Sequence, residues 1–343
     1  MRPALLFLAL LALSPLVAAD ESARRFLQKP DSWFASTEAK QVAAIILSFQ
    51  CDDGGWPKNT DTISKAYSGD RAKLQPTFDN KATVDELRFM ARIFNATQDA
   101  TYRKSFDRGL AYVLAAQYAN GGWPQFFPLR QGYYDRITFN DGAMVRVLEF
   151  VREVGRDERY AFLDAKFRAF CRQAFDRGIA CILKCQIVVE GQPTVWCAQH
   201  DEKTLAPAKA RSYELPSFSG SESVGIVRLL MSLEKPTPEI RASIEGAIAW
   251  FDAHKVTGQR LETKKNLLGT PDLVMVPDPK APALWARFYD LKTGAPYVCD
   301  RDGIPKAKLA DIGSERRNGY SWFGEYARDL LAKDYPSWKK AGR

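Results

Sequence analysis

The chain has 343 residues, of which 46% are hydrophobic and 26% charged, as expected for a soluble globular enzyme. A chain of this size buries a core large enough to make a disulfide framework unnecessary. The formal net charge of +8 favours an acidic partner, and nucleic acid, anionic lipid and an acidic polysaccharide all meet that condition.

The first residues have the pattern of a secretory signal peptide. Arg2 precedes an apolar run from Ala4 to Leu13, and small residues follow up to Ala19. The run is shorter than the roughly 20 apolar residues that span a bilayer. We expect cleavage after Ala19, a secreted or periplasmic protein, and one catalytic domain over residues 20–343. An uncleaved N-terminal anchor is the alternative.

Most of the remaining chain has the 3.6-residue apolar period of amphipathic helices. In the stretch Glu38–Phe49, for example, Val42, Ile45, Ile46 and Phe49 lie on one face. The predicted helices are Glu38–Phe49, Asn80–Phe94, Phe106–Ala116, Met144–Val151, Arg159–Lys184, Glu222–Leu233, Pro238–His254 and Trp322–Lys333.

A loop recurs between the predicted helices. The segment from Gln50 to Pro57 is matched, 67 residues later, by the segment from Gln117 to Pro124, and both contain Gly-Gly-Trp-Pro. A weaker third copy runs from Gln186 to Trp196. Two helices fit into each offset, and repeated units of this kind bury a shared core between neighbours. We therefore predict a mainly α protein, an incomplete α/α toroid of about three helical hairpins. Trp56 and Trp123 are interpreted as structural plugs.

The stretch from Leu261 to Arg317 contains six prolines and lacks a long helical period. It is interpreted as short strands and loops. We expect it to form a smaller lobe over about residues 256–318. The toroid would comprise about residues 30–255 and the C-terminal helix.

The six cysteines leave two interpretations open, namely one or two disulfides or simply buried thiols. Cys181 and Cys185 have helical i,i+4 spacing, and Cys197 follows the same segment. Structural zinc is disfavoured because paired close spacings with nearby histidines are missing.

Two segments with related sequences precede predicted helices at the same stage of successive repeats. Thr77-Phe-Asp-Asn contains Asp79, and Thr138-Phe-Asn-Asp contains Asp141. Taken singly, each is best interpreted as an N-cap. In a toroid, however, equivalent loops meet at one mouth, so Asp79 and Asp141 are expected to face each other. Oxygen ligands without cysteine or clustered histidine point to Ca²⁺ or Mg²⁺.

Two later segments concentrate polar side chains. The loop before the helix at Glu222 carries His200, Asp201, Lys209, Arg211, Tyr213 and Glu214. Arg287 and Arg301 lie in the proline-rich stretch. His200 is equally well interpreted as a satisfied core histidine, and Lys209 and Arg211 as solvated charges. Arg287 has the alternative of pairing with a nearby acid. Tyr133 and Tyr134 are candidates for sugar subsites.

Together, these motifs resemble the family 10 pectate lyases. The shared features, which cover nearly the whole chain after residue 19, are the two Gly-Gly-Trp-Pro loops, Thr77–Thr83, Thr138–Asp141, Trp196–Asp201, Ala210–Glu214 and Arg301–Gly303. The set is highly specific. One departure concerns position 206, where Ala206 stands in place of the lysine that often precedes this proline, and Lys209 is the nearest candidate to replace it.

The resemblance implies an α/α toroid that cleaves polygalacturonate by calcium-dependent β-elimination. It implies that Arg211 is the catalytic base and that Asp79 and Asp141 belong to the calcium and substrate-carboxylate site. Asn80 would support that site, and Arg287 and Arg301 would hold substrate carboxylates.

Lys209 and Tyr213 are added as candidate substrate-binding residues. We expect a monomer whose partner is the acidic polysaccharide, with no nucleic acid and no membrane.

Three other functions fit parts of the pattern. A toroidal glycoside hydrolase would use a carboxylate pair drawn from Asp79, Asp141 and Asp201. A non-catalytic pectin-binding protein would use the same basic surface. A terpene-cyclase-like toroid also uses glutamine and Gly-Trp repeats, but the basic charge and the signal peptide argue against it.

Overall fold

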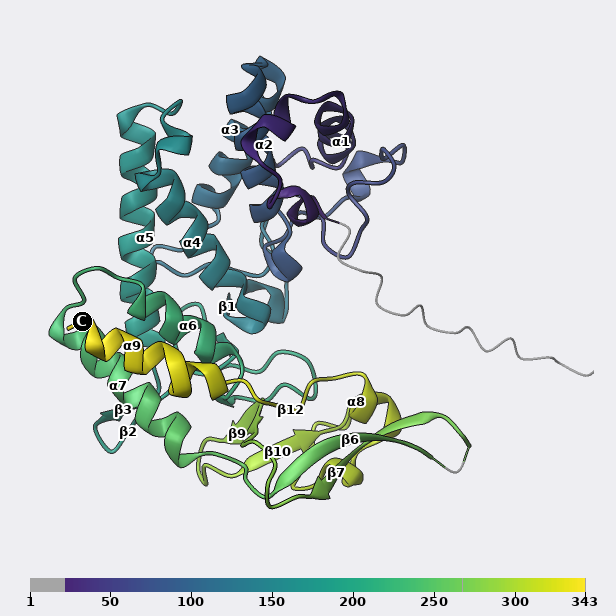
Figure 1. Cartoon of the computed structure of the whole chain (residues 1–343), viewed down its shortest axis with the longest axis vertical. Helices are drawn as coiled ribbons and strands as arrows, with labels where there is room; N and C mark the ends of the chain where they lie inside the picture. Colours follow the sequence, from purple (N-terminus) through teal and green to yellow (C-terminus); the bar gives the residue numbers. More distant parts are fainter. Residues whose placement is uncertain (1–21, 267, 343) are drawn as a thin grey trace, which may run out of the picture.

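The structure is a computed structural model that describes residues 22–266 and 268–342, so the expected signal peptide lies outside the described residues. The described chain is mainly helical and forms the expected incomplete α/α toroid, built around three antiparallel hairpins, α2–α3, α4–α5 and α6–α7 (Figure 1). The helices are α1 (Thr37–Ser48), α2 (Val84–Thr97), α3 (Ala100–Ala115), α4 (Ala143–Arg156), α5 (Ala165–Cys185), α6 (Glu222–Met231), α7 (Pro238–Ala253), α8 (Ser314–Asn318) and α9 (Tyr335–Lys340).

Side-chain caps fix where several helices begin. Ser36 Oγ accepts a hydrogen bond from the amide of Ala39 at the start of α1, and Asp164 accepts one from Phe167 at the start of α5. Such caps satisfy amides that have no partner inside the helix. Helix α2 begins only at Val84, four residues later than predicted, because the preceding residues adopt left-handed backbone conformations.

The repeat is visible in two hydrogen-bond patterns. A glutamine stands one or two residues after the end of each of the helices α1, α3 and α5. Its side-chain Nε2 donates to a carbonyl of the following loop and to a carbonyl of a later helix, which is α3, α5 or α7 respectively. The pairs are Gln50 with Gly54 and Ser105 (2.7 and 2.9 Å), Gln117 with Gly121 and Ala174 (3.0 and 2.8 Å), and Gln186 with Thr194 and Ser243 (2.7 and 2.9 Å). The weaker third copy is therefore a true structural repeat.

A buried tryptophan closes each loop. Its indole N–H donates to a carbonyl of the preceding helix or its end: Trp56 to Ile46 (2.8 Å), Trp123 to Val113 (2.9 Å), Trp196 to Ile182 (2.7 Å) and Trp285 to Phe251 (2.8 Å). All four side chains are fully buried, which confirms the interpretation of Trp56 and Trp123 as plugs. The fourth plug, after α7, has no Gly-Gly-Trp-Pro sequence around it, so the sequence search missed it.

Short strands dominate the chain after α7, as expected. The main sheet is antiparallel with the order β11–β10–β9–β5, so β5, which precedes α6, ties the helical part to the strands. The strands are β1 (Ile137–Thr138), β2 (Val188–Val189), β3 (Gln192–Pro193), β4 (Gln199–His200), β5 (Ser217–Ser219), β6 (Gln259–Lys265), β7 (Pro271–Pro277), β8 (Trp285–Ala286), β9 (Phe288–Asp290), β10 (Pro296–Cys299), β11 (Pro305–Lys306) and β12 (Phe323–Gly324).

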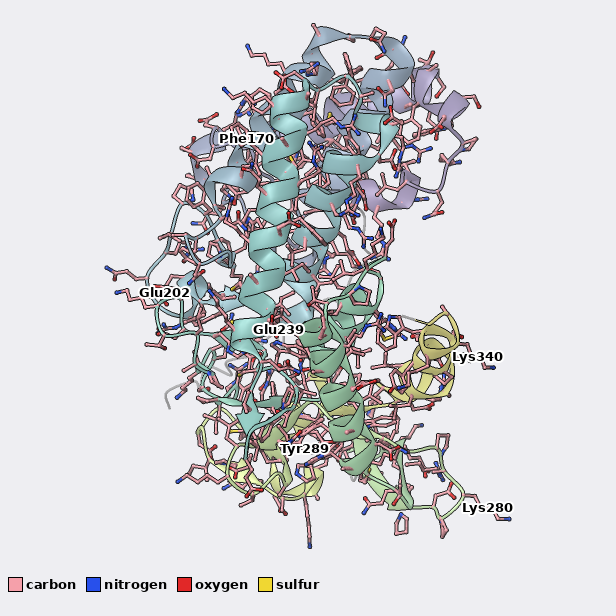
Figure 2. The ribbon with its side chains drawn as sticks, turned by 90° about the vertical axis from the view of Figure 1, so that its left-hand side faces the viewer. Phe170, Glu202, Glu239, Lys280, Tyr289 and Lys340 are labelled. Atoms are coloured by element: carbon pink, nitrogen blue, oxygen red, sulfur yellow. The ribbon has the colours of Figure 1, made fainter. Side chains whose placement is uncertain are left out.

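Figure 2 shows the long helix α5 in front, with Phe170 near one end and Tyr289 and Lys280 in the part of the molecule that holds the strands. The β6–β7 hairpin projects away from the remaining strands in Figure 1. Over residues 22–266 and 268–342, no helix is both long and apolar enough to cross a membrane.

The predicted helix Trp322–Lys333 starts too early. Residues Phe323–Gly324 form strand β12, which pairs with β8, and the helix begins only at Arg328 and continues through α9. Trp322 is fixed by its neighbours because its carbonyl accepts from the amide of Arg287 at 2.6 Å and its indole donates to Arg316. This pairing overrides the helical period of the local sequence.

All six cysteines are buried free thiols, which agrees with the second of the two interpretations. The Sγ atoms of Cys181 and Cys185 lie 4.0 Å apart, too far for a disulfide.

Candidate active site

The two loops that carry the candidate acids lie against each other. They are the short turns Asp79–Lys81 and Asn140–Gly142, each directly before or close to a helix of the toroid. The amides of Thr77 and Thr138 donate to the carbonyls of Trp56 and Trp123, both at 3.1 Å, so these threonines occupy the same position in successive repeats.

This common anchor corrects the expected pairing of the acids. Counting two residues from the threonines, Asp79 matches Asn140, and one residue further Asn80 matches Asp141. The backbone agrees, because Asn80 and Asp141 have φ of 49° and 50°, in the left-handed region that asparagine and aspartate tolerate best. Asp79 and Asp141 are neighbours at one mouth, but they do not occupy matching repeat positions, since the order of Asp and Asn is reversed.

Asp79 is buried and fully engaged. Its Oδ2 accepts hydrogen bonds from Lys58 Nζ and from Gln125 Nε2 (2.8 Å), and its Oδ1 accepts from the amide of Asn80 (3.0 Å). The Asn80 side chain is exposed and donates to Asn59 Oδ1 at 2.6 Å. The carboxylate therefore has one cation beside it and one donor from the next repeat.

Asp141 reaches the surface and meets a buried arginine. Its Oδ1 accepts from Arg287 at 2.9 Å, while 44% of its side chain remains exposed. The same Arg287 nitrogen also contacts Asn140 Oδ1 (3.1 Å) and the buried carboxylate of Glu222. Burial alone would lower the pKa of Arg287, but Glu222 and Asp141 raise it well above its usual value, so the guanidinium is permanently charged.

Arg211 forms a bidentate ion pair with Glu214, which stands three residues later in the chain. Its Nε donates to Glu214 Oε2 at 2.7 Å and its Nη2 donates to Glu214 Oε1. Burial lowers the pKa of Arg211, but the pair with Glu214 outweighs this effect and raises the pKa above its ordinary value. In the free protein the guanidinium is therefore held in its protonated form.

The aromatic ring of Tyr320 lies close to both Arg211 and Arg287. The guanidinium carbon of Arg211 lies 5.5 Å, and that of Arg287 4.8 Å, from the centre of its ring. Its hydroxyl donates to Glu214 Oε1 at 2.7 Å. Arg211 therefore lies in the same site as Asp141, one aromatic ring away. Burial raises the pKa of Tyr133, which was expected near a sugar subsite, and the positive charge of Arg211 opposes this rise.

The other expected substrate-binding residues lie at the edge of this group. Tyr213 is buried, and the guanidinium carbons of Arg211 and Arg301 approach its ring at 4.9 and 6.0 Å. Arg301 is exposed and pairs with Glu315 at 2.9 Å. Lys209 is exposed, on the same loop as Arg211.

The model of one protein family, described as pectic acid lyase, matches residues 50–331. The chain belongs to the pectic acid lyase family. Two solved structures agree: a family 10 polysaccharide lyase from Cellvibrio cellulosa, and a mutant of the same lyase in complex with trigalacturonic acid.

The free lyase has 33% identity and a TM-score of 0.78 over 94% of this chain and 97% of that chain. The complex has 32% identity and a TM-score of 0.78 over 94% of this chain and 98% of that chain. A search of curated proteins finds no match. This protein is thus a pectate lyase, and the family match favours a lyase over the glycoside hydrolase and the non-catalytic binding protein.

Asp201, one of the three acids that could have formed the carboxylate pair of a hydrolase, has other partners in the structure. Asp201 accepts from the amides of Lys203 and Thr204 within its own turn and pairs with Arg136. It therefore has a structural role.

His200 is the core histidine that the sequence left as an alternative. It is fully buried, its Nε2 accepts from the amide of Cys197 (3.0 Å), and its Nδ1 lies 2.8 Å from the carbonyl of Leu205. The neutral ring satisfies both partners with the proton on Nδ1. Burial lowers its pKa to about 4.

This shift predicts acid sensitivity in the lyase. Unfolded His200 takes up a proton near pH 6.5, whereas the folded residue stays neutral down to about pH 4, so stability is full above pH 6.5 and falls as the pH drops toward 4. The loss is on the order of 3 kcal/mol. His200→Gln, which keeps one donor and one acceptor, should flatten the dependence of the urea midpoint between pH 7 and 5. His254→Gln is the control, and equal slopes in the two variants would contradict the prediction.

The residues of the site fit a divalent cation only in part. Asp79, Asp141 and Asn80 offer oxygen donors, the type that Ca²⁺ prefers. Within the described residues, however, no three acidic, histidine or cysteine side chains come together to hold a metal alone. In addition, Lys58 and Arg287 already neutralise the two carboxylates. This donor set suits a cation shared with an anionic ligand.

Sequence reasoning missed several residues of the site. Lys58 and Gln125 each stand two residues after a plug tryptophan, and both donate to Asp79 Oδ2. Arg287, which the sequence did single out, stands at the same distance after Trp285. For Lys58 and Gln125 the signal was present in the sequence, because each directly follows a Trp-Pro pair. Tyr320 and Glu222, by contrast, carried no such local signal.

Proposed function

We propose that this lyase cleaves α-1,4-polygalacturonate by calcium-dependent β-elimination and releases unsaturated oligogalacturonides. The proposal rests on one observation, the gathering of Arg211 and Arg287 around Tyr320 beside the adjacent acids Asp79 and Asp141. A related lyase that binds trigalacturonic acid supports the same substrate class.

The chemistry explains why cations are needed. The C5 proton of a galacturonate is removed, a C4–C5 double bond forms, and the C4–O bond to the leaving sugar breaks. Negative charge accumulates on the carboxylate next to C5 as the proton leaves, so fixed positive groups lower the barrier. Arg287 and Arg301 are proposed to bind the uronate carboxylates, since a guanidinium matches a carboxylate in two-pronged geometry.

Calcium is proposed to lie between the protein and the uronate, held by Asp79 and Asp141 with the support of Asn80. When bound, it would stabilise the negative charge next to C5. Lys209 and Tyr213 are proposed to line the substrate site beside Arg211. Residues 20–343 are proposed to act as one exported monomeric domain after loss of residues 1–19.

Arg211 is proposed as the group that accepts the C5 proton. Its pair with Glu214 favours the protonated guanidinium, so only a small fraction is neutral at pH 7. Turnover is therefore expected to rise with pH, because each step toward the pKa increases the neutral fraction.

The test is an absorbance assay with polygalacturonate. Elimination creates an unsaturated chain end that absorbs ultraviolet light, whereas hydrolysis does not. We expect absorbance to rise at alkaline pH with Ca²⁺ and the rise to stop after addition of a chelator. Chain cleavage without absorbance would refute elimination, and unchanged rates in chelator would refute the calcium requirement.

A further inference from the structure

The four plug tryptophans place four equivalent residues around the active site. These residues stand two positions after each tryptophan: Lys58, Gln125, Ala198 and Arg287. The carbonyls of Gln125, Ala198 and Arg287 accept amides from the matching segments Phe78, Phe139 and Gly220 at 3.1, 2.9 and 3.0 Å. The backbone thus holds three of the four in equivalent positions, and Lys58 corresponds to Arg287 by its distance of two residues from a plug tryptophan.

Lys58 and Arg287 perform parallel tasks in the free protein. Lys58 pairs with Asp79, and Arg287 pairs with Asp141. Each proposed calcium ligand is therefore neutralised by a cation from an equivalent position of the fold. The two cations differ in one respect, because Arg287 is also fixed by the buried Glu222, whereas no carboxylate other than Asp79 pairs with Lys58 among the described residues.

The surroundings of Lys58 allow it to move. Its side chain is 26% exposed, while that of Asp79 is 5% exposed, so the ammonium lies on the solvent side of the pair. The ammonium also lies 5.3 Å from the centre of the Phe126 ring. A lysine carries its charge on a flexible four-carbon stem, and its compact ammonium can change partners without loss of a fixed geometry.

A carboxylate as buried as Asp79 requires a cation beside it. It does not favour two, because an ammonium and a divalent ion on the same carboxylate repel each other. Binding of a divalent cation at Asp79 therefore displaces Lys58, which then has an unpaired positive charge at the edge of the site. A uronate carboxylate is the partner that the proposed substrate brings to that position.

We propose that Lys58 is a tethered counter-ion that occupies the cation position of Asp79 in the free protein and moves to a uronate carboxylate when a divalent cation binds. This inference rests on the proposed calcium and polygalacturonate binding. Its consequence is linkage: calcium binds weakly to the free lyase and more tightly together with substrate, because the substrate supplies the new partner of Lys58.

Lys58→Gln is the variant that tests the proposal with least disturbance. Gln125 already makes the equivalent contact with Asp79 Oδ2, so a glutamine at position 58 can keep the hydrogen bond and remove only the charge. Calorimetric titration with CaCl₂ alone should show about tenfold tighter binding than in the unmodified lyase. The gain should vanish when Asp79→Asn is added. Lys104→Gln, an exposed lysine on α3, is the matched control and should change nothing.

The second measurement follows the ligand rather than the metal. In an Arg211→Ala background, which prevents cleavage, Lys58→Gln should weaken trigalacturonate binding in saturating calcium by about fivefold. Calcium affinity that is equal to or lower than that of the unmodified lyase would overturn the proposal, as would unchanged trigalacturonate affinity. If the unmodified lyase is calcium-dependent in the absorbance assay but either result is negative, the role of Lys58 fails while the proposed function stands.

Discussion

Arg287→Met should lower the free energy of unfolding by about 3–5 kcal/mol, the range found when one partner of a buried ion pair is removed. The arginine side chain is 9% exposed and that of its partner Glu222 is 2% exposed. Without the guanidinium, the Glu222 carboxylate keeps only the Ser219 hydroxyl as a hydrogen-bond donor in the described structure. Urea denaturation at pH 8 measures the loss.

Two further variants isolate the cause. Arg301→Met removes an arginine from an ion pair in which both side chains are more than half exposed, and it should have no measurable effect on stability. The double variant Arg287→Met/Glu222→Met should recover much of the loss, because no charge then remains buried without a partner. A similar loss in Arg287→Met and Arg301→Met would show that burial of the pair does not matter.

This result bears on function as well as stability. Arg287 is fixed from the inside by Glu222 and from the outside by Asp141, and Glu222 lies on α6 while Arg287 lies between two strands. Glu222 thus holds a guanidinium in place at the mouth of the toroid before any ligand arrives. A fixed cation costs little reorganisation on binding, which is why preorganised charge is effective in catalysis.

The repeat was predictable from sequence because it depends on local interactions. A glutamine, a glycine turn and a tryptophan lie within seven residues, and the tryptophan side chain donates to the helix that it follows, as Trp56 does to Ile46. The register of the acids was harder, because aligning Asp79 with Asp141 by residue type ignores the preceding Thr-Phe anchor. Only the hydrogen bonds of Thr77 and Thr138 fix that register.

Long-range pairs explain the remaining errors. Lys58 meets Asp79 across 21 residues, and Glu222 meets Arg287 across 65, so neither pair has a spacing that sequence periodicity reveals. The same holds for Trp322, whose carbonyl accepts from the amide of Arg287, 35 residues earlier. Arg211 and Glu214 are the exception, since they are three residues apart and both visible in one motif.

Arg211→Lys should reduce turnover by about 10²–10⁴-fold, the range expected when a positioned acid–base group is lost. A lysine cannot form the two-pronged pair with Glu214 or stay flat against Tyr320, so its amine will not occupy the position of the guanidinium. Initial rates of absorbance increase at saturating polygalacturonate measure the effect. Near-normal turnover would refute the assignment of Arg211 as the base.

The variant Glu214→Gln distinguishes a catalytic base at Arg211 from an arginine that only binds the substrate. Glu214 raises the pKa of Arg211, so its neutralisation should lower that pKa toward the value favoured by burial. At any pH below the pKa, a lower pKa means a larger neutral fraction, so the ascending limb of log kcat against pH should move to lower pH. The new amide oxygen can still accept from Tyr320, which limits rearrangement. If Arg211 only clamps the substrate, loss of Glu214 should reduce turnover by the same factor at every pH, because no proton transfer then depends on the guanidinium.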